Sequence, residues 1–299
     1  MKLFLVKTSL LIFFILVFLG ALELHSRKND VSYLKDKKDY FENNKNEIEC
    51  LVLGPSHILR AINLDLFNYN TLSLAISGSA SNVDCHLFDA VKDKINPKFV
   101  IINLSEWYIE RYRSDEWMRF HKLHYYFDVR YDRFKLKDLF FINYPIKEYL
   151  FSTKQKDRDN PRMKKHFLEL DYDKEKIKKN FTKKVARKLK NIHPQKEYKE
   201  NVALLYDVVR ECKERKIKVI FISPPKYYLY NEAVLSKPTN RRTNFLAPIV
   251  DNKTVYFLDY KSFNETNPHY FTDPHHLNPE GSILFTEELN RRLPSIVNY

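Results

Sequence analysis

The sequence predicts an α/β fold with a doubly wound, mostly parallel β-sheet, preceded by one transmembrane helix. Two observations predict the sheet: short apolar runs recur along the chain, and amphipathic helical stretches separate them. Runs without polar alternation are typical of strands buried on both faces, and helices between strands are typical of parallel sheets. A third observation, an apolar segment at the start of the chain, predicts the membrane helix.

The apolar segment, residues 1–25, is the first element. Lys2 and Lys7 give it a positive start, and its end lacks the small-x-small spacing of a cleavage site. About 20 apolar residues suffice to span a bilayer. We therefore predict an uncleaved signal anchor, with the N-terminus in the cytoplasm and the rest of the chain outside. Cleavage is the alternative. Residues 26–47 are polar and lack sustained periodicity, and are predicted to form a stalk.

Residues 48–299 are predicted to form one domain of the flavodoxin-like kind. Its strands are expected at residues 49–54, 71–75, 98–103, 218–222 and 255–258. Its helices are expected at residues 82–96, which Asn82 caps, at residues 200–215, and after Pro279. Ligands of such sheets bind beyond the carboxyl ends of the strands. The residues that follow each strand are therefore the candidates for a functional site.

Residues 107–195 interrupt this pattern and are predicted to form a helical insertion that caps the domain. The interval is dense in Tyr, Phe, Lys and Arg, and it is too long for a simple crossover. Its aromatic side chains form either the core of the cap itself or a surface on which sugar rings stack.

Charge and cysteine content narrow the function classes. The chain has 51 Lys and Arg residues against 38 Asp and Glu, a net charge of +13, which favours polyanionic neighbours. Because the domain is expected outside the cytoplasm, we expect membrane phosphates or an acidic or neutral envelope glycan as partner, and no nucleic acid. A solvated lysine-rich surface is the alternative. Cys50, Cys85 and Cys212 show neither a CxxC metal spacing nor the density of a disulfide scaffold.

Glycine is scarce, with four residues in the chain, so each one is a candidate for a position that only glycine can fill. Gly54 follows the first strand in the sequence Gly54-Pro55-Ser56. Gly78 follows the second strand, and Gly281 lies near the start of the last helix. All three are expected at one rim of the sheet, where the turn after Gly54 presents Ser56.

Three residues at this rim provide the groups that serine catalysis needs. A serine hydroxyl is a weak nucleophile unless a base accepts its proton, and a carboxylate orients an imidazole base. Ser56 is the predicted nucleophile, His276 the base, and Asp273, three residues before it, the orienting carboxylate. The backbone N–H of Gly78 is predicted to bind the oxyanion together with that of Ser56. This set predicts acyl transfer or ester hydrolysis.

These residues resemble those of a known superfamily. The Gly-x-Ser after the first strand, the glycine after the second, and the pattern Asp273-x-x-His276-Leu277-Asn278-x-x-Gly281 are similar to the SGNH (GDSL-type) hydrolases. They are most similar to the membrane-anchored branch associated with O-acylation of cell-envelope polysaccharides. The resemblance covers residues 48–106 and 200–295. It implies an envelope polysaccharide as substrate and a membrane-bound protein as acyl donor; no cofactor or metal is expected.

Two positions depart from the pattern of that superfamily. Its first block has Gly-Asp-Ser, where this chain has Pro55. Its third block supplies an asparagine that binds the oxyanion, where this chain has Ser105. Asn103, two positions earlier, carries the required amide, and we predict it as an oxyanion donor beside Gly78. A donor from the cap is the alternative.

Other interpretations of these residues remain open. Ser56 and Asp273 are also favoured helix caps. A metal could bind to His269, Asp273, His275 and His276, although their spacing matches no familiar zinc pattern. The alternative function is that of a catalytically inactive SGNH-like scaffold that binds or assembles an envelope glycan.

Overall fold

The computed structural model confirms the predicted α/β fold. It describes residues 1–28, 33–130, 195–232 and 236–298. The sheet consists of five parallel strands: β1 (Cys50–Leu53), β2 (Thr71–Ser73), β3 (Phe99–Asn103), β4 (Lys218–Ser223) and β5 (Val255–Asp259). Their order, β2-β1-β3-β4-β5, is that of a flavodoxin-like doubly wound sheet.

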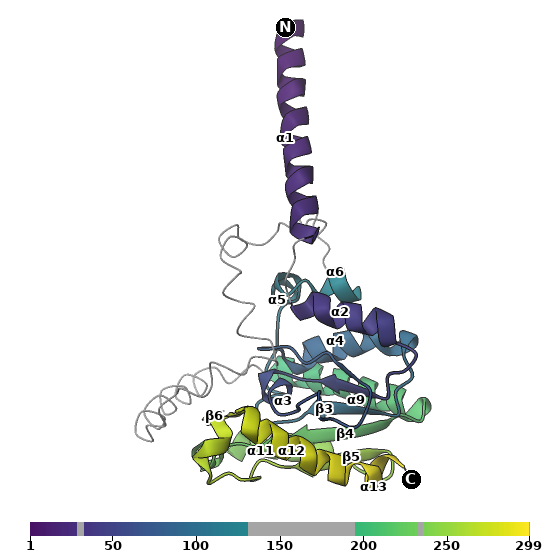
Figure 1. Ribbon diagram of the computed structural model, residues 1–299, viewed down its shortest axis with the longest axis vertical. Coiled ribbons are helices and arrows are strands. Elements are labelled where there is room, and N and C mark those ends of the chain that lie inside the picture. Colours follow the sequence, from purple (N-terminus) through teal and green to yellow (C-terminus); the bar gives the residue numbers. More distant parts are fainter. Residues whose placement is uncertain (29–32, 131–194, 233–235, 299) are drawn as a thin grey trace.

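Helices cover both faces of the sheet, because its strands are apolar on both sides. Every residue of β1, β2 and β3 is buried. The core on one face includes residues of α2 (Tyr33–Asn44), α4 (Ser81–Val91), α9 (Gln195–Glu214) and α11 (Ser236–Leu246). The core on the other face includes residues of α3 (Ser56–Leu59), α12 (Pro279–Arg292) and α13 (Pro294–Val297). Figure 1 shows the sheet between α2 and α4 on one side and α12 and α13 on the other.

Shorter elements complete the described chain. They are η1 (Lys92–Lys94), α5 (Asp115–Phe120), α6 (Leu123–Phe127), α10 (Tyr228–Glu232), η5 (Pro268–Tyr270) and the antiparallel pair β6 (Phe271–Asp273) and β7 (His276–Leu277). Of the predicted insertion, residues 107–130 form a loop with α5 and α6, whereas residues 131–194 lie outside the described residues. In the described part Tyr108, Tyr126 and Phe127 are buried, so these aromatic side chains belong to the core of the domain.

Two helix boundaries differ from the prediction. Helix α4 begins at Ser81 after Ala80, which makes no capping hydrogen bond, so the prediction of Asn82 as the cap was wrong. The side chain of Asn82 lies inside the first turn and holds the backbone of Arg113 instead. Helix α9 begins at Gln195 rather than at residue 200.

The stalk predicted for residues 26–47 contains a helix that packs on the domain. In α2, Leu34 and Phe41 are buried in the same core as the sheet. They lie two helical turns apart on one face, a stripe too sparse to give a detectable period in an otherwise polar segment. The folded domain therefore begins with α2 rather than at residue 48.

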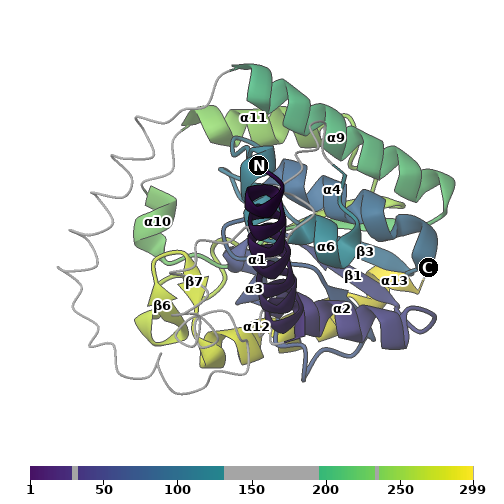
Figure 2. The same ribbon diagram turned by 90° about the horizontal axis from the view of Figure 1, so that it is seen from above.

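The N-terminal helix α1 (Lys2–Lys28) is the one helix in the described part of the chain that is long and apolar enough to cross a membrane. It projects away from the domain, as Figures 1 and 2 show, and its apolar side chains are exposed. Its last turn meets the domain, where the Arg27 guanidinium lies 5.1 Å from the centre of the Tyr125 ring.

Candidate active site

The serine is placed by a turn that requires glycine. Gly54 directly follows β1 and has φ +146°, a backbone conformation that other residues rarely adopt. A Cβ atom there would lie 2.6 Å from Cβ of Asn103 and 2.6 Å from Cγ2 of Ile58. The chain therefore passes closely over β3 and enters α3 at Ser56, which is half-buried at the carboxyl edge of the sheet.

The histidine and the aspartate are placed by the turn between β6 and β7. Asp273 ends β6 and pairs with His276, which begins β7. The backbone N–H of His275 donates to Oδ1 of Asp273 at 2.9 Å, which fixes the carboxylate within the turn. The second oxygen, Oδ2, lies 2.9 Å from Nδ1 of His276.

The structure brings the three predicted triad residues together. Oγ of Ser56 lies 2.8 Å from Nε2 of His276, whose Nδ1 faces Asp273. Both distances are within hydrogen-bond range. The three side chains thus form a continuous chain from a hydroxyl through an imidazole to a carboxylate, which is the arrangement that activates a serine.

Gly281, the last glycine of the sequence pattern, allows α12 to pack against the segment that precedes the turn between β6 and β7. A Cβ at Gly281 would lie 2.3 Å from the carbonyl oxygen of Tyr270, so only glycine lets α12 pack this closely against η5. Asn278 caps α12, since its Oδ1 accepts from the N–H of Gly281 at 2.9 Å. Asn278 and Gly281 therefore have a structural role: they position the segment that contains Asp273 and His276.

Burial and charge favour a neutral imidazole at His276. Burial lowers its pKa below the ordinary 6.5, the hydrogen bond with Asp273 opposes that effect, and the charges of Arg60 and Lys226 lower the pKa further. Burial alone would raise the pKa of Asp273, but hydrogen bonds with His275 and His276 hold it well below its usual range. Near neutral pH the site therefore holds an ionised Asp273 and an unprotonated His276, ready to accept a proton.

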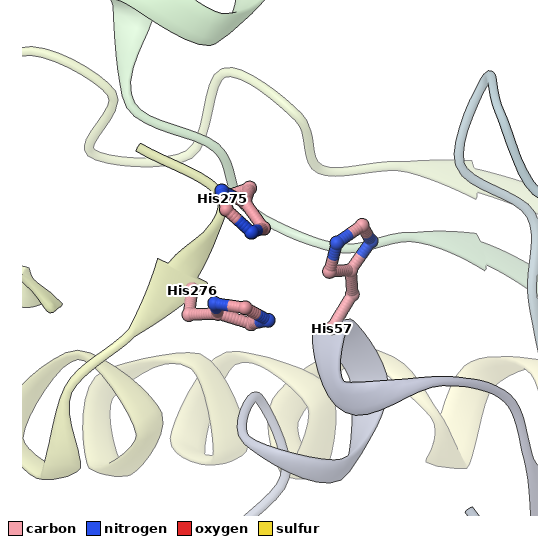
Figure 3. A group of neighbouring side chains, drawn as sticks. All are labelled: His57, His275 and His276. Carbon is pink, nitrogen blue, oxygen red and sulfur yellow. The ribbon is translucent and has the colours of Figure 1, made fainter. Parts of the chain in front are cut away.

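Three histidines, His57, His275 and His276, lie close together, as Figure 3 shows. Their ligating nitrogens lie within 4.8 Å of one another, close enough to consider a metal site. Both nitrogens of His276 are already engaged, by Ser56 and by Asp273. The fully buried ammonium of Lys226 donates to the carbonyl of His275 at 3.1 Å, and a positive charge so near opposes a second cation. The geometry therefore fits a triad better than a metal site.

The metal alternative considered from the sequence also included His269. This residue lies in η5 and is not one of the three histidines grouped together in the described residues.

Gly78, the predicted oxyanion donor, follows β2, the strand that pairs with β1. The N–H of Ile76 donates to the carbonyl of Gly54 at 2.9 Å, which aligns the ends of the first two strands. Ser56 lies two residues after Gly54 in the chain, and Gly78 lies two residues after Ile76. Gly78 has φ +79° and space on its open side, where a Cβ would lie 3.7 Å from Nη2 of Arg113.

Asn103 is placed differently from Gly78. It is fully buried against Gly54, and its Nδ2 donates to Oγ of Ser105 at 3.3 Å. Its amide is thus engaged behind the turn that carries Ser56. The oxyanion role of Gly78 and that of Asn103 stay predictions.

Sequence reasoning missed the cationic residues of the site. Lys226 follows Ser223-Pro224-Pro225 at the end of β4, so the rule that sites lie beyond strand ends could have found it. Arg111 and Arg113 were noted only as part of a basic interval, yet both donate to the carbonyl of Gly78. No local signal marks them, because their position depends on contacts made across the fold.

The fold and the site define a doubly wound α/β protein with a serine–histidine–aspartate arrangement at the carboxyl edge of its sheet. No protein-family model and no curated protein matches the chain. Among solved structures it is similar to a candidate acylhydrolase from Bacteroides fragilis (13% identity, 90% of this chain and 97% of that one, TM-score 0.41). It is similar also to a GDSL-like lipase from Bacteroides thetaiotaomicron (14%, 88% and 98%, 0.40) and to TesA (9%, 83% and 99%, 0.40). The function proposed below rests on the geometry of the chain itself.

Proposed function

We propose that this protein is an SGNH-type serine enzyme that transfers or hydrolyses an acyl ester. The observation that carries the proposal is the hydrogen-bonded chain from Ser56 Oγ through His276 to Asp273, with distances of 2.8 Å and 2.9 Å. Its position at the carboxyl edge of a doubly wound sheet is where such folds bind ligands.

The chemistry follows from the geometry. Oγ of Ser56 attacks the acyl carbonyl carbon while Nε2 of His276 accepts the hydroxyl proton. The N–H groups of Ser56 and Gly78 bind the oxyanion that forms. When the intermediate collapses, the alcohol leaves with the proton from His276, and the acyl group stays on Ser56. Water or an acceptor hydroxyl then attacks this acyl-enzyme, and His276 accepts its proton in turn.

We propose a glycan of the cell envelope as the substrate, carrying O-acetyl or a similar acyl group. The sequence resemblance to the membrane-anchored SGNH branch supports this, and so does the net charge of +13, which suits an acidic polymer. Transfer is preferred over hydrolysis because an anchored domain outside the cytoplasm would lie beside a membrane-bound acyl-donor protein. Both reactions use the same acyl-enzyme.

The second candidate is an inactive scaffold that binds or assembles the glycan. Pro55 and Ser105, which replace residues of the SGNH pattern, favour it. The intact contact between Ser56 and His276 favours the enzyme, since a scaffold has no need for that hydrogen bond.

A fluorophosphonate probe separates the two candidates, because it modifies an activated serine and not an inert one. The full-length protein in neutral detergent should be labelled at Ser56, identified by peptide mass spectrometry. Ser56→Ala should abolish labelling, whereas Ser295→Ala, an exposed serine in α13, should leave it unchanged. A folded wild-type protein that resists the probe would support the scaffold.

A further inference from the structure

Two arginines lie beside the glycine of the candidate oxyanion site. Nε of Arg113 donates to the carbonyl of Gly78 at 2.9 Å, and Nη2 of Arg111 approaches the same oxygen at 3.4 Å. The free amino end of the Arg113 guanidinium covers the open side of Gly78 and stacks above Trp117, 5.2 Å from the ring centre. Both arginines are half-buried, so a ligand at the sheet edge can reach them.

The backbone that carries these arginines is rigidly held. Asn82 of α4 both accepts from the N–H of Arg113 at 3.0 Å and donates to its carbonyl at 2.7 Å. Asn201 of α9 donates to the carbonyls of Ile109 and Arg111 at 2.7 Å and 2.8 Å. Both asparagines are fully buried. Two helices therefore hold the backbone from which the guanidinium groups extend, and this restricts the positions that they can reach, as a preformed binding site requires.

Two nearby arginines, Arg241 and Arg242, form ion pairs with glutamates, whereas Arg111 and Arg113 do not pair with a carboxylate in the described residues. Arg241 pairs with Glu110 at 2.7 Å, and Arg242 pairs with Glu106 at 3.0 Å. Within the described ranges Arg111 and Arg113 form no ion pair with a carboxylate.

Nearby acidic groups do not fully neutralise the positive charges of Arg111 and Arg113. Asp84 acts on Arg111, but burial raises the pKa of Asp84 to about 7, while Tyr108 and Ser79 donate to its Oδ2. Burial and the neighbouring Arg113 lower the pKa of Arg111 to about 10, and burial lowers that of Arg113. Two like charges, partly removed from water, are therefore set side by side, and an anion placed between them would relieve both costs.

Contacts also connect the arginine pair with the triad. The Tyr230 ring interacts with the charge of Arg111 and packs 6.0 Å from the ring of His275, next to His276 in the chain. Ser56 and Gly78 lie in the segments that follow the adjacent strands β1 and β2. A substrate with its ester at Ser56 would therefore extend naturally toward the arginines.

We infer that Arg111 and Arg113 form an anion subsite that binds a carboxylate or phosphate group of the substrate next to the ester attacked by Ser56. This deepens the proposed function and rests on it. Planar guanidinium groups suit both anions, because each can donate two parallel hydrogen bonds to paired oxygens. The substrate class is thus an acyl ester of an acidic compound rather than of a neutral one.

Binding to the full-length Ser56→Ala protein in neutral detergent tests the subsite without turnover. Isothermal titration would compare monomethyl glutarate, an anionic ester, with dimethyl glutarate, its neutral counterpart, and with 2-acetoxyethyl phosphate. We expect at least one anionic ester to bind about 10-fold more tightly than the neutral ester. Tighter binding of the glutarate indicates a carboxylate-bearing substrate, and tighter binding of the phosphate a phosphorylated one.

Variants show whether the arginines cause that preference. Arg111→Gln/Arg113→Gln, which keeps polar donors near Gly78, should remove the preference and leave neutral-ester binding within about 3-fold. The lysine pair Arg111→Lys/Arg113→Lys should retain part of it. Arg210→Gln, on the exposed face of α9 and paired with Asp207, is the matched control and should change nothing.

Three results would overturn the inference: equal binding of charged and neutral esters, no measurable binding of either anion, or a preference that survives the glutamine pair. A glutamine pair that lowers the melting temperature without altering the preference would assign the arginines a structural role, the support of the Gly78 carbonyl, instead. Fluorophosphonate labelling of the parent protein reports the proposed function separately. Labelling without anion preference rejects only the subsite, and anion preference without labelling rejects only the serine enzyme.

Discussion

His276 connects every group of the candidate triad, since one ring nitrogen faces Ser56 and the other faces Asp273. An imidazole held in this way has a fixed tautomer, with the proton on Nδ1 and a lone pair directed at the hydroxyl. The hydroxyl and the imidazole therefore act as a unit, and neither has catalytic value alone.

Substitutions in the triad should show this dependence as strong non-additivity. Ser56→Ala and His276→Ala should each lower kcat for an aryl acetate by about 1,000-fold or more, and the double variant should be hardly worse than either. Asp273→Asn should retain slightly more activity, because it disturbs only the orientation and tautomer of the imidazole. The measurement is ester hydrolysis by each full-length variant, with thermal unfolding as the control for folding.

Two outcomes would count against the triad. If Ser56→Ala keeps full activity and its melting temperature, the serine only begins α3, and the scaffold becomes the better proposal. If the effects of Ser56→Ala and His276→Ala multiply in the double variant, the two residues act independently.

The pH dependence of the reaction should follow the lowered pKa of His276. Its imidazole must be unprotonated to accept the serine proton, so activity is present above its pKa and is lost as the pH falls through it. Because burial, Arg60 and Lys226 lower that pKa, the acidic limb of kcat/KM should have its midpoint below pH 6.5.

Lys226 supplies a test of the cause. Lys226→Met removes a positive charge and should move the acidic midpoint upward, whereas Lys196→Met, at an exposed position on α9, should leave it in place. A wild-type midpoint at or above 6.5 would contradict the neutral imidazole inferred from the structure.

At the scale of elements, two close approaches of the backbone position the triad. Gly54 lets β1 turn over β3, and Gly281 lets α12 pack under η5. Gly54→Ala and Gly281→Ala should each lower the free energy of unfolding by about 1–3 kcal/mol, because the added methyl group has no space. Gly54→Ala should also reduce ester hydrolysis, since it displaces the turn that carries Ser56.

Gly20 is the matched control for these substitutions. A Cβ there meets nothing within 4 Å, so Gly20→Ala should leave both stability and activity unchanged. Denaturant unfolding in detergent measures all three variants, and an unaffected Gly281→Ala would show that α12 can shift without cost.

Elements whose residues are patterned strongly were predictable, and elements that depend on distant contacts were not. The strands were found because residues such as 99–102 are apolar without interruption. Helix α2 was missed because only Leu34 and Phe41 mark its buried face. The capping role given to Asn82 failed because a side chain that can cap can also bind a remote loop, here at Arg113.

In the candidate site, sequence spacing predicted the contacts between residues of one turn, but spacing alone did not predict contacts between distant segments. Asp273 and His276 meet within one turn, and Ser56 joins them because strand ends share one edge of the sheet. The amide of Asn103 could not be placed from sequence, since its burial depends on the Gly54 turn, which packs against it only in the folded chain. Arg113 reaches Gly78 only through the folded loop after β3.

At the scale of the whole molecule, one apolar helix is attached to a basic domain that contains the candidate triad. The last turn of α1 contacts α6, because Arg27 packs over Tyr125. Helix α6 belongs to the same segment after β3 that supplies Arg111 and Arg113. The proposed anchor therefore joins the domain beside the segment from which the anion subsite is built, which suits a substrate or donor held near a membrane.

The membrane association of the chain gives the last prediction. Helix α1 contains an 18-residue window of mean hydropathy 2.5, and none of this window is buried by the domain. Exposure of so large an apolar surface to water is energetically unfavourable. The full-length protein should therefore remain with the membrane pellet after a high-salt wash, which removes charge-mediated contacts, and should be released by detergent. N-terminal sequencing should find residues 1–25 still present. A chain that begins at residue 29 is the control. It remains strongly basic, with a net charge of +10 after the loss of Lys2, Lys7, Arg27, Lys28 and Glu23 from the full chain's +13. If salt releases it while the full chain stays bound, the helix and not the basic surface anchors the protein. Recovery of a soluble form beginning near Glu23 would show cleavage instead; the proposed triad would stand, and the preference for a membrane-bound acyl donor would lose its support.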